Sequence, residues 1–202
     1  MRLSVSNKLA LCRSLLYCLF VWLLPALSYA DTPVLSAAEG FGVEVKNAEI
    51  TLKGDNYMLS ADIDYQLSAR AMEALQSGVP LFWDIHIKTI QRRDFLWDKT
   101  LINAAIRYRI QYHALLNMYR VRNESSGATY NFSTLSAAFD LMSAIYDFPV
   151  MYRARYKQGE RYAVEIKVTL DRDALPLPLR PVAYTNPQWY LSSDWTLWPL
   201  TK

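Results

Sequence analysis

Hydrophobic and polar residues alternate with a period of two along most of the chain, which predicts a domain built mainly from β-strands. The alternation is clearest over residues 57–67. It follows a turn at 54–56 and predicts a hairpin with the strand expected at 43–52. A change of parity at Asn47 predicts a bulge in that first strand. Further strands are expected at 81–88, 106–112, 119–123, 128–132 and 162–170.

Two segments have apolar residues at helical spacing instead. Residues 69–77 follow Ser68, a good N-cap, and end at Gly78. Residues 133–145 begin at Ser133, and Pro149 is expected to end that region. Strands that are apolar on one side only favour an antiparallel sheet with one face on a core. The predicted fold class is therefore mainly β (α+β): a β-sandwich-like single domain with two short helices.

The C-terminal tail has a different composition. Five of the eight prolines after residue 30 lie in it, and so do Trp189, Trp195 and Trp198. Prolines favour an extended backbone, and tryptophan rings are more often buried than displayed. We expect a Pro/Trp-rich strap that covers the core or a sheet edge, with contact between the tail and a membrane interface as the alternative.

The first thirty residues are typical of a secretory signal peptide. Basic residues at Arg2, Lys8 and Arg13 precede an apolar run at 15–27, and Ser28-Tyr29-Ala30 has the small residues that a signal peptidase reads. We therefore expect a signal peptide at 1–30, a tether at 31–40 and a domain at 41–202. The expected location is the periplasm of a bacterium, with an uncleaved inner-membrane anchor as the alternative.

Cleavage changes what the composition implies. The chain has 202 residues, 52% of them hydrophobic, a net charge of +3 and two cysteines. The expected mature chain has 172 residues, no net charge and no cysteine, since the leader contains both cysteines and three uncompensated basic residues. Thiol chemistry and cysteine metal sites are excluded for it. Nucleic acid is not an expected partner, because a zero net charge and export both disfavour it.

The charge of the mature chain is divided along its length. Residues 31–98 carry 6 basic and 11 acidic side chains, and residues 99–202 carry 13 basic and 8 acidic ones. Within the basic part, Arg107, Arg109, Arg120 and Arg122 repeat an Arg-x-Arg spacing on two strands that are expected to pair. Pairing would gather four guanidinium groups on one sheet face, which suits an anion or an acidic partner. The alternative is a solvated face whose arginines pair with the acidic part of the same molecule.

Motifs for common enzyme chemistry are missing. The sequence has no phosphate-binding loop, dinucleotide fingerprint, G-x-S-x-G or H-E-x-x-H. No catalytic residue, cofactor or metal is expected. Three weaker alternatives rest on pairs or trios that share a strand face or a turn: Asp62 with Asp64, Asp171 with Asp173, and a metal site of Asp84, His86 and His113.

Three segments resemble a known family. They are Leu175-Pro176-Leu177-Pro178-Leu179-Arg180, Ser192-Ser193-Asp194-Trp195 with Trp198-Pro199-Leu200, and Arg107-Tyr108-Arg109 with Tyr112-His113-Ala114-Leu115. Together they resemble the bacterial domain of unknown function forty-three-ninety, over nearly the whole mature chain. The resemblance implies an exported protein of about this length without assigned activity. Genes of some members lie near those of envelope-linked sensor kinases, which favours signalling.

The expected function is a non-enzymatic binding or signalling accessory of the cell envelope. Its expected partner is an envelope protein or an anionic envelope component, bound through the arginine face or the tail. Membrane contact is expected only through the signal segment, if that segment stays attached. The alternatives are a hydrolase or lyase acting on envelope glycan or lipid, and a carrier of a small ligand.

Overall fold

A computed structural model describes residues 40–200, all of which belong to one compact unit. The predicted signal peptide and all but the last residue of the predicted tether lie outside the described residues. The helices and strands are β1 (Gly42–Lys53), β2 (Asn56–Gln66), α2 (Ala69–Gln76), β3 (Leu81–Arg92), β4 (Lys99–His113), β5 (Met118–Asn123), β6 (Thr129–Phe132), α3 (Leu135–Ser143), β7 (Ala144–Tyr152), the 3₁₀ helix η1 (Arg153–Arg155), β8 (Arg161–Leu170), α4 (Arg180–Thr185), the 3₁₀ helix η2 (Pro187–Trp189) and β9 (Thr196–Leu200). None of the helices in this part of the chain is long and apolar enough to cross a membrane.

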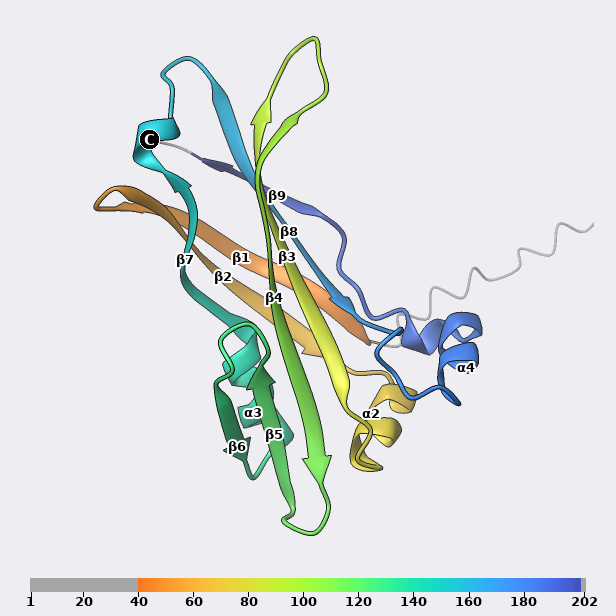
Figure 1. Ribbon diagram of the computed structural model, residues 1–202. Helices are drawn as coiled ribbons and strands as arrows, with labels where there is room; N and C mark the ends of the chain where they lie inside the picture. The colour runs from red at the N-terminus through yellow and green to blue at the C-terminus, as the bar shows by residue number, and fades with distance from the viewer. Residues whose placement is uncertain (1–39, 201–202) are drawn as a thin grey trace, which may run out of the picture. The chain divides into compact units, whose positions relative to one another are not determined.

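The strands form two antiparallel sheets (Figure 1). The smaller sheet has the order β1-β2-β7, and the larger has the order β6-β5-β4-β3-β8-β9. Alternate residues of both sheets are buried in one shared hydrophobic cluster. The predicted fold class, a mainly β, sandwich-like domain with short helices, is confirmed.

The first hairpin forms as its alternation predicts. Strand β1 pairs with β2 from Gly42 opposite Gln66 to Lys53 opposite Asn56, and the register shifts between Val45 and Asn47. This shift is the predicted bulge.

The core joins the two sheets and one helix through aromatic packing. Tyr65 of β2 lies edge-on to Trp83 of β3 at a ring-centroid distance of 5.0 Å, and it stacks on Phe139 of α3 at 5.5 Å. Trp83 is completely buried. Aromatic pairs in these arrangements stabilise a core beyond the area they bury.

Both predicted helices form, with a shifted boundary in the second. Ser68 caps α2 by accepting a hydrogen bond from the backbone N–H of Ala71, as predicted. The cap of α3 is Thr134 rather than Ser133, and it accepts a hydrogen bond from the N–H of Ala137.

Sequence periodicity missed strand β7. The expected helix of 133–145 ends at Ser143, and residues 144–152 form a strand that contains Pro149. Proline lacks a backbone N–H, so it fits a sheet only where no ladder bond is needed, such as on an edge strand. Strand β7 is an edge strand, because it pairs only with β2.

The C-terminal tail covers the core, but it is not wholly extended. Trp189 is only 3% exposed and Leu191 is 1% exposed, which agrees with the predicted strap. The tail also contains the short helices α4 and η2, because Pro181 and Pro187 occupy first-turn positions where a missing N–H is harmless. It ends in β9, which pairs with β8.

Candidate functional site

All four predicted arginines lie on the face of the larger sheet that points away from the core. Strands β4 and β5 pair as expected, with Arg109 directly opposite Arg122 and Gln111 opposite Arg120. The intervening residues Ile110 and Val121 are opposite each other and fully buried. Because side chains alternate between the faces of a sheet, the arginines share the outer face.

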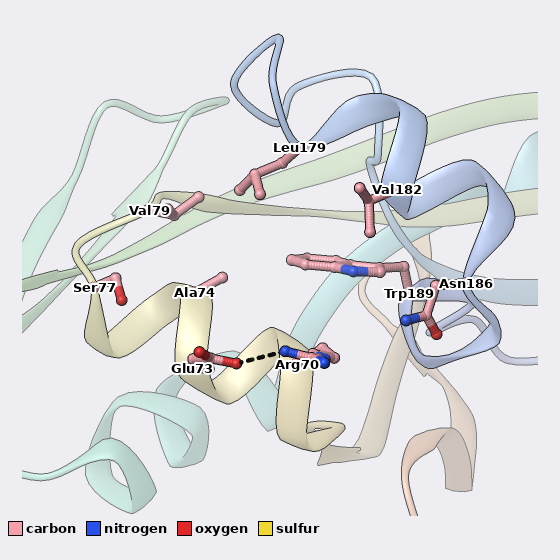
Figure 2. Close-up of a pocket in the computed structure, with 9 residues that line it drawn as sticks. All are labelled: Arg70, Glu73, Ala74, Ser77, Val79, Leu179, Val182, Asn186 and Trp189. Atoms are coloured by element: carbon pink, nitrogen blue, oxygen red, sulfur yellow. Dashed lines mark hydrogen bonds and ion pairs between the residues drawn. The ribbon is translucent and has the colours of Figure 1, made fainter.

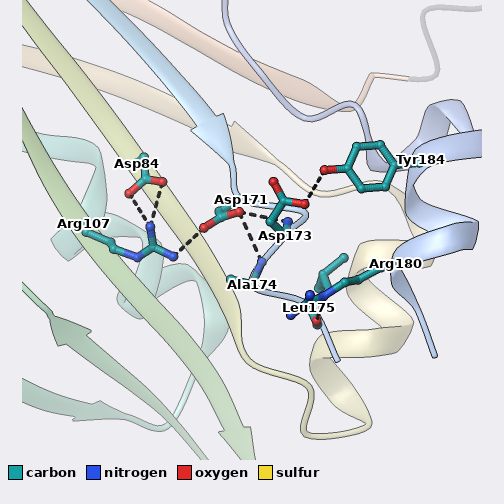
Figure 3. Close-up of polar contacts among 8 residues, drawn as sticks. All are labelled: Asp84, Arg107, Asp171, Asp173, Ala174, Leu175, Arg180 and Tyr184. Carbon is teal, nitrogen blue, oxygen red and sulfur yellow. Dashed lines mark hydrogen bonds and ion pairs between the residues drawn. The ribbon is translucent and has the colours of Figure 1, made fainter. Parts of the chain in front are cut away.

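Arg107 is neutralised within the protein (Figure 3). Its Nη1 lies 3.1 Å from Oδ2 of Asp84, the residue opposite it on β3, and its Nη2 lies 2.5 Å from Oδ2 of Asp171. Its guanidinium carbon lies 5.0 Å from the ring centroid of Phe82. Arg107 therefore ties β4 to β3 and to the turn that follows β8.

The same network continues into the tail. Asp171 Oδ1 accepts hydrogen bonds from the backbone N–H groups of Asp173, at 2.9 Å, and Ala174, at 3.2 Å. Tyr184 of α4 donates its phenolic proton to Asp173, which raises the pKa of that phenol (Figure 3). Asp171 and Asp173 thus have structural partners, and they hold the tail against the larger sheet.

The other three arginines have much less compensation. Arg109 Nε lies 3.1 Å from Glu124 Oε1, and Arg122 Nε lies 3.4 Å from Glu124 Oε2. Arg120 Nε donates to the neutral side chain of Asn131 at 3.1 Å. Glu124 is thus the only carboxylate in ion-pair contact with these three guanidinium groups among residues 40–200.

This arrangement divides the predicted arginine face into two parts. Arg107 has two carboxylates, so its part carries no positive excess. We call Arg109, Arg120 and Arg122 the arginine patch. It has three positive charges and one carboxylate, Glu124, so two positive charges are not neutralised. A planar guanidinium with free N–H groups is suited to binding carboxylates and phosphates.

The carboxylates considered for catalysis do not form an acid–base pair. Asp64 lies 2.7 Å from Lys46 Nζ and accepts a hydrogen bond from Gln66 Nε2 at 3.1 Å. The hydrogen bond from Lys46 lowers the pKa of Asp64, so this carboxyl group stays ionised and is unsuited to donate a proton. Asp62 is exposed on the same strand.

The structure does not bring the two histidines together, so the alternative metal site of Asp84, His86 and His113 does not form. His86 lies opposite Ala105 on β4, whereas His113 is at the end of β4, opposite Met118. Ala105 and His113 are eight positions apart, roughly 26 Å along an extended strand. Among the described residues, no group of three or more His, Cys, Asp or Glu side chains is placed to hold a metal ion.

A second group on the outer face was not predicted. Trp195, in the Ser-Ser-Asp-Trp segment, lies over the sheet with Lys88 Nζ 3.9 Å from its ring centroid and His86 at 6.4 Å between ring centroids. The alternation of β3 places His86 and Lys88 outward. Nothing in the sequence indicates that the C-terminal tail folds back and places Trp195 beside His86 and Lys88.

One pocket lies between α2 and the tail helices (Figure 2). It has a volume of about 390 Å³. Its apolar lining comprises Ala74, Val79, Leu179, Val182 and Trp189, and its polar lining comprises Arg70, Glu73, Ser77 and Asn186. Arg70 and Glu73 form an ion pair at 3.1 Å on one side, and the Trp189 ring lies across the space between the helices. A volume of this size is in the range of small-molecule sites.

Fold and site together define a class: a two-sheet, mainly β domain with a basic patch on the outer face of its larger sheet. The family comparison agrees with the resemblance in the sequence. A model of the family described as domain of unknown function (DUF4390) matches residues 41–199, so the chain belongs to that family. The comparisons with curated proteins and with solved structures found no match.

Proposed function

We propose that this protein is a non-enzymatic binding domain of the bacterial cell envelope, exported by its N-terminal segment, that contacts an acidic partner through the arginine patch. The observation that carries the proposal is that, within residues 40–200, three arginines on an outer sheet face have one carboxylate between them: Arg109 and Arg122 share Glu124, and Arg120 contacts only the neutral Asn131. Charge of this kind steers an acidic partner and increases its association rate.

The surroundings of the patch support a contact surface rather than a catalytic cleft. The three arginines come from two neighbouring strands, β4 and β5, whose register fixes their spacing. The side chains of Arg109 and Arg122 are 33% and 43% exposed. A partner carboxylate placed over the patch would supply acceptors to several of these donors at once.

The enzyme alternative has less support. A hydrolase that uses two carboxylates needs one of them protonated, and Lys46 excludes Asp64 from that role because it holds this group in its ionised form.

A binding measurement tests the proposal. The probe is a fluorescein-labelled peptide of ten glutamates, and its affinity is measured by anisotropy at low and at physiological salt. We expect Arg120→Glu/Arg122→Glu to weaken binding at least about tenfold, since charge reversal turns attraction into repulsion. The control is Lys46→Glu/Arg70→Glu, which makes the same charge change at two exposed positions outside the patch. Equal affinity of the patch variant and the wild type would refute the proposal, as would an equal loss in the control.

The pocket favours a second candidate function, the carriage of a small ligand. The probe is the dye 1-anilinonaphthalene-8-sulfonate, whose emission increases in apolar sites. Val182 lies half-exposed at the rim. We therefore expect Val182→Trp to fill the pocket and abolish the emission, with Val182→Thr as the control that keeps it open. Unchanged emission in Val182→Trp would exclude this pocket as the dye site.

A further inference from the structure

The turn between β3 and β4 exposes three consecutive large apolar side chains. Phe95 is 99% exposed, Leu96 is 66% exposed and Trp97 is 92% exposed. In Figure 1 the hairpin loop between these strands stands clear of the other elements. Single exposed apolar residues are common on protein surfaces, but a contiguous group marks an interaction site. We call residues 95–97 the apolar tip.

Polar contacts hold this turn with its apolar side chains outward. Asp98 Oδ1 accepts a hydrogen bond from the backbone N–H of Arg93 at 3.2 Å. Asp94 forms an ion pair with Arg161 of β8. Both acidic residues beside the apolar tip therefore have partners within the protein, and the charge of Asp94 is compensated by Arg161.

Basic residues without ion pairs in the described part of the chain lie next to the apolar tip in the sequence and at the same end of the sheets. Arg92, Arg93 and Lys99 flank it along the chain. Two more, Arg153 and Arg155, lie in η1 at the same end of the sheets: Arg92 is opposite Arg161, the first residue of β8, and Tyr156 packs on Tyr162 of β8 at 5.4 Å. None of these five side chains forms an ion pair with another residue in the range 40–200.

We propose that this end of the protein docks on an anionic lipid surface, with the apolar tip inserted to headgroup depth and the five cations against lipid phosphates. Tryptophan and phenylalanine favour the membrane interface, and lysine or arginine side chains near them add attraction to anionic lipids. A bilayer fits better than a protein pocket because the cations come from two separate elements around a projecting turn. A planar charged layer meets all of them, whereas a pocket would enclose only the turn.

This proposal goes beyond the proposed function and does not depend on it. It also extends membrane contact from the N-terminal segment, where the sequence places it, to the folded domain. The arginine patch lies toward the other end of β4: Lys99 and Arg109 are ten residues apart, roughly 33 Å along the strand. A lipid-bound protein would therefore keep the patch free for its partner.

Vesicle co-sedimentation tests the proposal. A chain beginning at Asp31 is used, so that the apolar leader cannot bind lipid itself; it contains the whole compact unit with its own core. The vesicles are equimolar phosphatidylglycerol and phosphatidylcholine, with pure phosphatidylcholine for comparison. We expect binding to the anionic vesicles that falls with salt, and weaker binding to the neutral ones.

Three variants complete the test. Phe95→Ser/Leu96→Ser/Trp97→Ser should reduce binding at least about tenfold, because the apolar insertion is lost. Arg153→Glu/Arg155→Glu should reduce binding to anionic vesicles only. The matched control is Leu115→Ser/Leu116→Ser, which removes exposed apolar residues from the turn at the opposite end of β4. It should bind like the wild type.

The proposal is overturned if the wild type does not sediment with anionic vesicles, or if the tip variant binds as well as the wild type. An equal loss in the Leu115/Leu116 control would also overturn it, since the binding would then reflect general hydrophobicity. Crosslinking of the apolar tip to an envelope protein, without vesicle binding, would assign the tip to a protein partner instead. None of these outcomes depends on the glutamate-peptide measurement.

Discussion

The hydroxyl of Thr89 donates a hydrogen bond to the backbone carbonyl of Val150 at a distance of 2.7 Å, and both residues are completely buried. Thr89 belongs to β3 in the larger sheet and Val150 to β7 in the smaller one. Val150 is the bulge residue of β7, because Met151 is opposite Tyr57 and Pro149 is opposite Met58. A threonine of one sheet thus supplies a donor to the irregular backbone of the other.

Thr89→Val should lower the free energy of unfolding by about 1–3 kcal/mol, since the nearly isosteric side chain leaves the buried carbonyl without this donor. Urea denaturation followed by circular dichroism measures the change. Thr129→Val on the exposed strand β6 is the control, expected to stay within about 0.5 kcal/mol. Equal effects at the two positions would contradict a specific role for the inter-sheet bond.

Ser193 should be the stabilising residue of the Ser192-Ser193 pair. Its hydroxyl accepts from the N–H of Val168 at 2.9 Å, and its own N–H donates to the Val168 carbonyl at 2.8 Å. Ser193→Ala should cost about 1–3 kcal/mol, because a buried backbone donor loses its acceptor. Ser192→Ala, which changes an exposed neighbour, should cost little. The same denaturation experiment compares the two variants, and a reversed order would refute the prediction.

Arg107 should act as an anchor of the tail rather than as a contact residue. Arg107→Gln leaves Asp84 and Asp171 without their cation, and we expect faster amide hydrogen exchange over residues 171–185. Arg120→Gln should leave exchange in that segment unchanged, because Arg120 contacts Asn131 on β6. If glutamate-peptide binding fell strongly in Arg107→Gln while exchange stayed normal, the assignment of Arg107 would be wrong.

Asp64 should make stability depend on pH in the acidic range. Its pKa is lower in the folded protein than in the unfolded chain, mainly because of the hydrogen bond from Lys46. The stabilisation is therefore fully present above the usual aspartate pKa, and it is lost as pH falls through the lowered value. The stability difference between wild type and Asp64→Asn should be constant above about pH 5 and shrink below about pH 4.

Denaturation curves between pH 3 and pH 7 check this dependence. Asp62→Asn, which changes a neighbouring aspartate of β2, is the control and should show a smaller difference. A difference that grew as the pH fell would have the wrong sign and would contradict the role of Lys46.

The local pattern of apolar and polar residues predicted those helices and strands that bury one face against the core and expose the other. The alternation of β2, the bulge at Asn47 and the cap at Ser68 all follow from residues close in sequence. Strand β7 was missed because Pro149 is read as a breaker, whereas an edge position tolerates it. Helix α4 was missed for a related reason: Pro181 indicates an extended strap, yet it occupies the first turn of a helix.

The candidate site was only partly predictable. The Arg-x-Arg spacing placed four arginines on one face, because alternation determines the face to which each side chain points. It did not show that Asp84 and Asp171 neutralise Arg107, while Arg109 and Arg122 share Glu124 and Arg120 contacts only Asn131. Asp171 is 64 residues from Arg107 in the chain, and only the return of β8 beside β3 brings it close.

The sequence by itself determined the family, the mainly β fold class and the side of the larger sheet on which the basic residues lie. These properties depend on residue type and on spacing within one strand, which act over a few residues. Only the tertiary structure decided which arginines keep uncompensated charge, that His86 and His113 are separate, and that no element within residues 40–200 covers Phe95, Leu96 and Trp97. Strand order and register determine these outcomes, because a charge or an apolar side chain is compensated only by groups that the fold brings within contact distance.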